Sequence, residues 1–152
     1  MKMKDQIKQL KAENDRLRML LAGDVREPVT MASDIAKTFI PKLATEMQEC
    51  VYVLYLDNKH KVVEEKMVTK GTLNQSLVHP REVFATAVQL RAASIIMLHN
   101  HPSGNCEPSS NDANITKRIF EAGLILGINL LDHIIIAGSS FYSFAEHNAM
   151  PA

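Results

Sequence analysis

A buried strand linked by a long helix to a second buried strand is the feature that most constrains how this sequence can fold. The apolar run 94–98 is followed by a polar loop, by helical spacing over 109–126 and by a β-rich run over 128–137. Strands flanked by helices of this length predict an α/β layer built on a mixed sheet.

Upstream of this unit the sequence predicts a hairpin and a helix. Two β-rich runs, 51–56 and 61–68, flank a turn at 57–60 and indicate antiparallel strands. Pro80 opens a helix. The residues expected to face the core from this helix are Val83, Phe84, Ala87, Val88 and Leu90. A last short strand is predicted over 141–144.

Composition limits the class of protein. The chain has 152 residues, of which 46% are hydrophobic and 22% charged, as expected of one globular domain with a packed core. Seventeen basic side chains balance seventeen acidic ones, so the basic excess usual in proteins that bind nucleic acid non-specifically is missing. No apolar run reaches the roughly 20 residues of a membrane span. The N-terminus does not resemble a secretory signal, and two cysteines form no disulfide framework, so we expect a cytoplasmic protein.

The first 23 residues carry a heptad pattern. Its seam positions are Met3, Ile7, Leu10, Asn14, Leu17 and Leu21. Gly23 then marks the end of the helix. In a parallel pair, Glu13 of one copy would face Arg18 of the other, which favours a homodimer. The alternative is an amphipathic helix that lies on its own domain.

The expected domain organisation follows from these segments. Residues 1–23 form the heptad helix, and residues 24–48 form a linker and a helix, expected over 31–48 and interrupted near Pro41. The main domain is expected over 49–146, and residues 147–152 form a tail.

The chemistry is concentrated in the loop that begins with His99-Asn100-His101. The carboxyl end of a strand is where α/β sheets commonly hold their sites. His99 and His101 are two residues apart in an extended segment, so both imidazoles project to one side. Asp112, in the first turn of the following helix, can bring a carboxylate oxygen to the same point. An isolated His-x-His also occurs in hydrogen-bonded loops, but with Asp112 the pattern predicts a metal site with three protein ligands.

Three protein ligands are typical of a catalytic zinc ion, which keeps a fourth position for water and lowers the pKa of that water to about 7. A general base is still required, and Glu49 is the best candidate because it precedes a strand whose end can lie beside the strand bearing His99. Ser109 could hydrogen-bond the oxyanion of a tetrahedral intermediate. Its Ser-x-x-Asp spacing to Asp112 is equally the pattern of a helix-capping box, which requires no chemistry.

Three further residues have alternative interpretations. Cys106 lies in the same loop and could replace Asp112 as a ligand, or it could simply pack. His133 could orient a ligand from behind, or form an ordinary hydrogen bond at the start of a strand. His79 is most simply the residue at which a helix begins.

The complete pattern resembles the JAMM (MPN/JAB) metalloenzyme motif: His-x-His, seven residues, Ser-x-x-Asp and an upstream Glu. The wording His99-Asn100-His101-Pro102-Ser103-Gly104, followed by Pro108-Ser109 and Asp112, is similar to the RadC-type branch. Further matches are Leu56-Asp57, Gly71-Thr72, His79-Pro80-Arg81-Glu82 and Leu131-Asp132-His133-Ile134-Ile135. Together these matches span about two-thirds of the chain.

The resemblance implies a cytidine-deaminase-like α/β fold in which a mixed sheet is flanked by helices. It implies a zinc centre held by His99, His101 and Asp112, with Glu49 as acid/base and Ser109 as transition-state stabiliser. The implied activity is zinc-dependent hydrolysis of a peptide-like or isopeptide bond.

Two other functions remain open from the sequence. The chain could be a non-catalytic, metal-containing interaction module that works through its N-terminal dimer. It could also be a DNA-associated factor, because the RadC branch carries a DNA-repair label. Longer RadC-like proteins begin with a helix-hairpin-helix DNA-binding region, however, whereas this chain has the heptad segment. A nucleobase deaminase would need His-x-Glu and Pro-Cys-x-x-Cys, and the sequence has neither.

Overall fold

The computed structural model of the chain describes residues 2–21, 28–71 and 78–152. The elements are α1 (Lys2–Leu21), α2 (Ala32–Leu43), β1 (Cys50–Leu56), β2 (Val62–Lys70), α3 (Pro80–Gln89), β3 (Ser94–Asn100), α4 (Ser110–Leu126), β4 (Asn129–Ala137) and β5 (Ser140–Ser143). Each strand expected from the sequence is present, with ends that differ by one or two residues.

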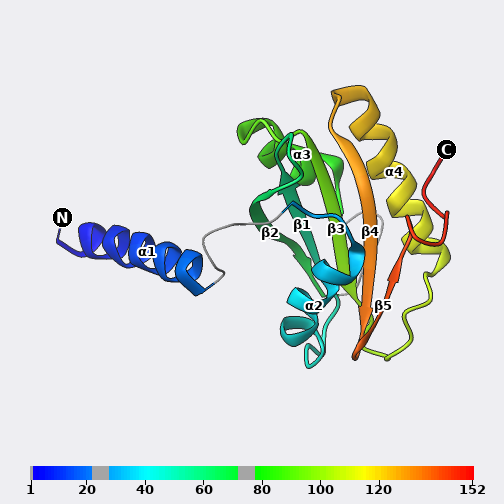
Figure 1. Cartoon of the computed structure of the whole chain (residues 1–152), viewed down its shortest axis with the longest axis horizontal. Coiled ribbons are helices and arrows are strands. Elements are labelled where there is room, and N and C mark those ends of the chain that lie inside the picture. The colour runs from blue at the N-terminus through cyan, green and yellow to red at the C-terminus, as the bar shows by residue number, and fades with distance from the viewer. Residues whose placement is uncertain (1, 22–27, 72–77) are drawn as a thin grey trace.

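The strands form one five-stranded mixed sheet in the order β2-β1-β3-β4-β5 (Figure 1). Strands β3 and β4 are parallel, while the pairs β1–β2, β1–β3 and β4–β5 are antiparallel. The single parallel pair is joined through α4, as expected for a parallel crossover. The predicted α/β fold with a mixed sheet and the predicted hairpin are both confirmed.

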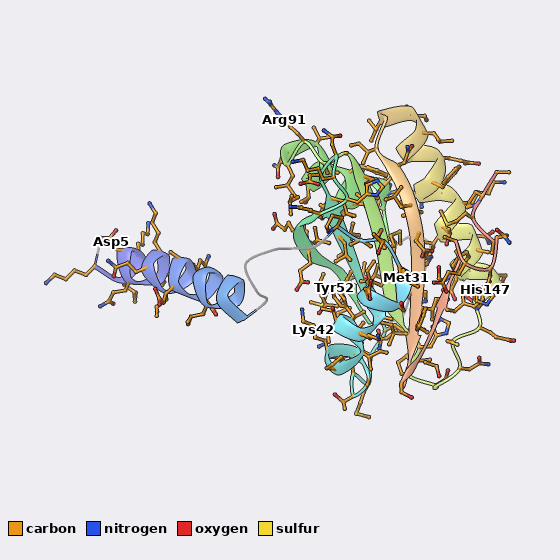
Figure 2. All side chains as sticks on the ribbon, viewed as in Figure 1. Asp5, Met31, Lys42, Tyr52, Arg91 and His147 are labelled. Atoms are coloured by element: carbon orange, nitrogen blue, oxygen red, sulfur yellow. The ribbon has the colours of Figure 1, made fainter. Side chains whose placement is uncertain are left out.

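Helices cover both faces of the sheet. On one face, α3 and α4 pack on the side chains of Val53, Tyr55, Ile95 and Met97, among others. On the other face, α2 packs on a core that contains Leu54, Leu56, Ile96, Leu98, Ile134 and Ile136. Figure 2 shows how side chains fill the space between the sheet and these helices; Tyr52, which is labelled there, meets Phe39 of α2 with ring centroids 5.5 Å apart.

The alternation of side chains along β3 assigns its last two residues to opposite faces. All seven residues of β3 are buried. His99 follows Ile95 and Met97 on the α4 face, whereas Asn100 follows Ile96 on the α2 face. A polar residue is thus buried under each helical layer at the carboxyl end of the central strand.

The helices begin and end where side-chain and backbone chemistry dictate. His79 caps α3 by accepting a hydrogen bond from the Arg81 backbone N–H, with Pro80 in the first turn, as predicted. Ser109 and Asp112 form a complete capping box at the start of α4. Gly127 ends this helix with a left-handed φ of 72°, which glycine adopts without a steric penalty.

Two expectations about helices are corrected. The helix expected over 31–48 with an interruption near Pro41 is the shorter Ala32–Leu43, and it continues through Pro41. Proline near the end of a helix removes only one hydrogen bond of the last turns, and the helix stops two residues later. Val88 and Leu90 were expected in the core but are 57% and 37% exposed, because the buried stripe of α3 is limited to Val83, Phe84 and Ala87.

Helix α1 does not pack on the sheet along its described side chains. Its seam residues Met3, Ile7, Leu10 and Leu17 are between 48% and 72% exposed. Figure 1 shows the helix apart from the α/β body. In this structure α1 does not lie on its own domain, which was one of the two arrangements expected from the sequence. Most of the predicted linker, and Gly23, lie outside the described residues.

None of the helices in the described part of the chain combines the length and the apolar character that crossing a bilayer requires.

Candidate metal centre

Three side chains meet at the carboxyl end of β3. His99 is in the strand, His101 follows it directly, and Asp112 is the third residue of α4. The Nε2 atoms of the two histidines are 2.9 Å apart, and each lies close to one oxygen of Asp112, at 3.2 Å for His99 and 3.1 Å for His101. His99 and Asp112 are buried, and the His101 side chain is 12% exposed. The structure thus brings together the three residues that the sequence predicts as ligands.

The geometry of this group fits a divalent ion. Ligand atoms about 2.0–2.2 Å from a tetrahedral zinc ion are about 3.3–3.6 Å from one another. The separations of 2.9–3.2 Å are slightly shorter, so an ion needs only a small outward movement of the side chains. Two imidazoles and one carboxylate are also a donor set that zinc commonly accepts. Among the described residues, His99, His101 and Asp112 are the group that could hold a metal ion.

Asp112 is fixed at both its backbone and its side chain. Its backbone N–H donates to Ser109 Oγ at 3.1 Å, and its Oδ2 accepts from the Ser109 backbone N–H at 2.8 Å. Burial, the largest single influence, would by itself raise the pKa of this carboxyl, but the contacts with His101, His99 and the Ser109 backbone together outweigh burial and hold the pKa well below its usual range. Asp112 is therefore an anion at neutral pH, as a metal ligand must be.

His101 is oriented by the backbone. The backbone N–H of His101 donates to the Ile136 carbonyl at 2.8 Å, and its ring Nδ1 donates to the Asn105 carbonyl at 2.7 Å. Since a carbonyl only accepts, the proton must be on Nδ1, and Nε2 faces Asp112. The hydrogen bond to Asp112 raises the pKa of His101.

His99 is held from behind by His133 of the parallel strand β4. His99 Nδ1 and His133 Nε2 are 2.7 Å apart. The His133 ring stacks on Phe144 at 5.0 Å and contacts the Thr116 hydroxyl through Nδ1 at 2.6 Å. Complete burial is the main cause that lowers the pKa of His133 well below its usual value, so its ring is neutral. The contact between His133 and His99 is thus shown, and the role of His133 in orienting a metal ligand stays a prediction.

Glu49 lies next to strand β1, as the sequence predicts. Val51 pairs with His99, so the start of β1 is beside the carboxyl end of β3. Glu49 is half-buried, and its charge contributes to the raised pKa of His101. The described structure thus places its charge within electrostatic reach of the site; its role in catalysis stays a prediction.

Asn100 clamps the backbone on both sides of Glu49. Its Oδ1 accepts from the Cys50 N–H at 2.7 Å, and its Nδ2 donates to the Gln48 carbonyl at 3.0 Å. The Glu49 carbonyl in turn accepts from the Gly71 N–H at 2.8 Å. The middle residue of His-Asn-His therefore fixes the segment that carries the candidate base.

Two other candidates have clear structural positions. Ser109 is exposed and caps α4, so the capping interpretation is confirmed. A hydroxyl that accepts a hydrogen bond still has a proton to donate, so its role as a stabiliser stays a prediction. Cys106 is not part of the metal-binding group, and it is a half-buried free thiol.

The sequence alone missed Thr116 and the role of Asn100. Asn100 could have been found from strand alternation, because a polar residue between two predicted ligands must face the opposite side of a buried strand. Thr116 lies one helical turn after Asp112, on the same side of α4. No pattern along the chain connects it to His133.

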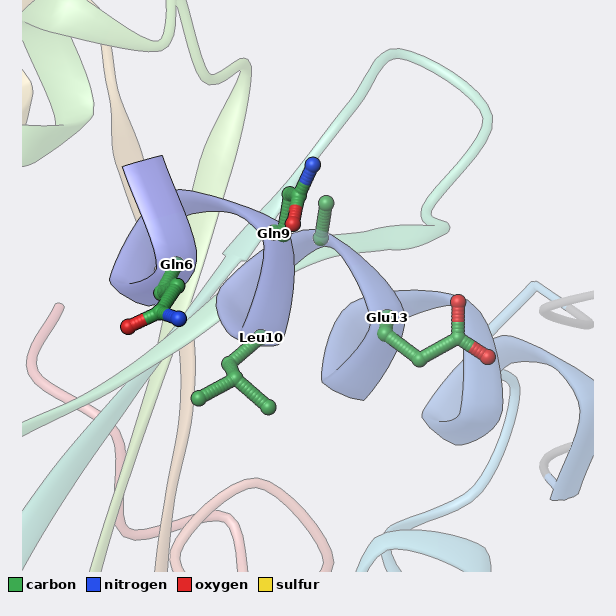
Figure 3. Close-up of a pocket in the computed structure, with 5 residues that line it drawn as sticks. Gln6, Gln9, Leu10 and Glu13 are labelled. Carbon is green, nitrogen blue, oxygen red and sulfur yellow. The ribbon is translucent and has the colours of Figure 1, made fainter. Parts of the chain in front are cut away.

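Two hollows of the described surface lie away from this group. One, shown in Figure 3, is lined by Gln6, Gln9, Leu10, Ala12 and Glu13, all from α1. Such a hollow is a groove on one helix rather than a ligand pocket. A second hollow lies between α3 and the end of α4. The site is identified by its converging donors.

A mixed sheet covered by helices, with two imidazoles and a carboxylate converging at the end of its central strand, fits a metal-dependent, hydrolase-like α/β domain. Comparison with known families agrees, since the model of the RadC-like JAB domain matches residues 29–149. The chain belongs to the RadC-like JAB domain family.

Curated relatives support this assignment. A UPF0758 protein of Staphylococcus aureus (strain bovine RF122 / ET3-1) is 46% identical over 136 residues, which cover 90% of this chain and 55% of the relative. A UPF0758 protein of Clostridium perfringens is 48% identical over 122 residues, covering 80% of this chain and 54% of the relative. The chain thus spans about half the length of the curated relatives it matches.

Proposed function

We propose that the chain is a zinc-dependent hydrolase that cleaves a peptide-like or isopeptide bond. The observation that carries the proposal is the convergence of His99, His101 and Asp112 within 3.2 Å of one another, two of them fully buried. Imidazole and carboxylate donors held this close have a stabilising role only if a cation or a proton lies between them. Family membership makes a metal ion the better explanation.

Each residue has a distinct task in this proposal. His99, His101 and Asp112 hold the ion, which when bound supplies a Lewis acid and a water of lowered pKa. Glu49 accepts a proton from the attacking water and returns it to the leaving amine. Ser109, at the rim of the site, donates its hydroxyl proton to the oxyanion that develops on the substrate carbonyl.

The backbone around these residues supports the assignment. Glu49 lies on a segment anchored by Asn100 and by Gly71, so its carboxylate is attached to a fixed rather than a loose backbone. The proposed cellular location is the cytoplasm. Cys50, the neighbour of Glu49, is a buried free thiol, as is usual in a reducing compartment.

The test compares the wild type with Glu49→Gln. Protein purified without added metal is analysed for bound ions and is then screened against peptide and isopeptide substrates. We expect about one zinc ion per chain in both proteins, hydrolysis by the wild type, and hydrolysis lowered at least ~100-fold in the variant, as for loss of a general base.

Three results would contradict the proposal. Absence of any bound divalent ion would contradict the metal centre, and equal hydrolysis by Glu49→Gln would contradict the assignment of Glu49 as the general base. Metal binding without hydrolysis of any substrate would favour an interaction module. Affinity for DNA that falls steeply with salt would instead favour a DNA-associated factor.

A further inference from the structure

We propose that Thr116 and His133 are positioning residues that fix the proton of His99 on Nδ1 and so keep its Nε2 lone pair directed at the metal position. This inference rests on the proposed metal-dependent function and deepens it. It concerns one row of buried contacts that runs from the backbone of α4 through β4 to β3.

The row begins at a carbonyl, which can only accept. The Thr116 hydroxyl donates to the Asp112 carbonyl at 2.7 Å, one helical turn back. The hydroxyl has a single proton, so the oxygen of Thr116 must accept in its second contact. That contact is with His133 Nδ1 at 2.6 Å, which places a proton on Nδ1 of His133.

The next step follows from the neutral imidazole ring. With its proton on Nδ1, His133 presents Nε2 as an acceptor. The atom facing this nitrogen, at 2.7 Å, is His99 Nδ1, which must therefore donate. The proton of His99 is then fixed on Nδ1, and Nε2 has a lone pair.

The same lone pair is what a metal ion requires. His99 Nε2 lies 2.9 Å from His101 Nε2 and 3.2 Å from an oxygen of Asp112, inside the group of ligand atoms. His101 achieves the equivalent arrangement with one carbonyl, that of Asn105. His99 is inside a strand, where the backbone carbonyls form hydrogen bonds with neighbouring strands. The side chains of His133 and Thr116 therefore fix the proton of His99 on Nδ1, as the Asn105 carbonyl does for His101.

The reverse arrangement is unfavourable at the first contact of the row. If the Thr116 hydroxyl turned to donate to His133, its oxygen would face the Asp112 carbonyl oxygen at 2.7 Å with no proton between them. His133 would then have its proton on Nε2, opposite His99 Nδ1, and His99 would move its own proton to Nε2. Phe144 stacks on the His133 ring with an interplanar angle of 9° and keeps that ring in plane.

The first test changes the Thr116 hydroxyl. Thr116→Val keeps the shape and removes the hydroxyl, whereas Thr116→Ser keeps the hydroxyl. We expect Thr116→Val to weaken zinc binding by about 10- to 100-fold, the usual effect of losing the partner of a ligating histidine, and Thr116→Ser to restore it. The zinc dissociation constant is measured by competition with a chelator, alongside the unfolding midpoint of the metal-free proteins.

The chain offers a matched control. The Thr38 hydroxyl in α2 makes the same bond to a carbonyl four residues back, at 3.1 Å on an exposed surface. Thr38→Val is expected to bind zinc as the wild type does. Wild-type affinity in Thr116→Val, or equal loss in Thr116→Val and Thr116→Ser, would overturn the proposal.

The second test needs no variant and no metal. In metal-free wild-type protein with ¹⁵N-labelled histidine, NMR distinguishes the two neutral tautomers of each ring. We expect protons on Nδ1 of both His99 and His133; a proton on Nε2 of His133 would overturn the proposal even if the Thr116 variants failed to fold. Because this measurement involves no zinc and no substrate, its result is separate from the success or failure of the proposed hydrolase function.

Discussion

Helix α1 and the end of strand β3 break the usual rule of burial in opposite directions. At the end of β3, His99, Asn100 and Asp112 are polar and almost completely buried. In α1, Leu10 is apolar and 69% exposed. Buried polar groups and exposed apolar surfaces are the two kinds of exception that carry information about function.

The two exceptions differ in how they are satisfied. Each buried polar side chain at the end of β3 has a hydrogen-bond partner of the same chain. The described apolar side chains in the seam of α1 are instead exposed, and the α/β domain does not cover them. The polar side chains of the first region contact one another, whereas the described apolar side chains of the second are exposed, so changes in the two regions should act on different properties.

The largest effect on the folded domain is expected from Asp112→Ala. It removes a buried anion from two histidines and one partner of the capping box, so we expect the free energy of unfolding to fall by about 3 kcal/mol. Zinc affinity should fall more than ~100-fold, since a direct ligand is lost and even its outer partners account for 10- to 100-fold. Denaturant titration and chelator competition measure the two effects.

The control for this change is Asp34→Ala, which removes an acidic residue from the first turn of α2. It should leave zinc affinity unaltered. If Asp112→Ala bound zinc as tightly as this control, the metal centre would have to be built from other residues.

The next effect is expected from Asn100→Ala, on the other face of β3. Two backbone groups, the Cys50 N–H and the Gln48 carbonyl, lose their partner, which should cost about 2 kcal/mol in total, at about 1 kcal/mol each. Zinc affinity should stay near the wild-type value, because Asn100 faces away from the ligands. Hydrolysis should fall through displacement of Glu49.

Asn129→Ala, at the exposed start of β4, serves as the control for stability. A large loss of zinc affinity in Asn100→Ala would contradict the separation of the two faces of β3.

A smaller effect is expected from pH on the metal-free protein. His133 has a lowered pKa, so its contribution to stability is present above pH 6.5, the ordinary pKa of histidine being about 6.5, and is lost as pH falls. The reason is that the unfolded chain binds a proton at this residue at a pH where the folded chain does not. His101 has a raised pKa, so its contribution is present below about 6.5 and is lost as pH rises through its folded pKa. Stability should therefore be greatest near pH 6.5.

Urea titrations with a chelator between pH 4.5 and 8.5 measure this profile, whose slope for one proton cannot exceed about 1.4 kcal/mol per pH unit. His133→Gln should flatten the acid side and His101→Gln the alkaline side. Each variant is the control for the other, and an unchanged profile in both would show that neither histidine determines it.

The smallest effect on the folded domain is expected in α1. We propose that its seam pairs with a second copy as a parallel homodimer, so Leu10→Lys should convert a dimer into a monomer while zinc affinity and domain stability stay unchanged. Analytical ultracentrifugation measures the state of assembly. Gln9→Lys adds the same charge beside the seam and should remain dimeric; a wild type that is monomeric would contradict the pairing.

Local patterns were sufficient to predict much of this protein. The positions of the strands, the hairpin, the capping box and the group of His99, His101 and Asp112 that could hold a metal ion follow from side-chain alternation, turn residues and spacings of a few positions. These features are short-range, so neighbouring residues decide them. The resemblance to RadC-like proteins depended on the same short motifs.

Contacts between residues far apart in the chain could only come from the tertiary structure. His133 reaches His99 because β4 pairs in parallel with β3, with His133 opposite Met97. Asn100 reaches Cys50 because β1 pairs antiparallel with the same strand. Helix α2, which the sequence placed outside the domain, covers one face of the sheet. Strand order and register arise from the packing of the whole core, so no local pattern contains them; the sequence by itself determined which residues could bind a metal, and the fold decided which residues hold them in place.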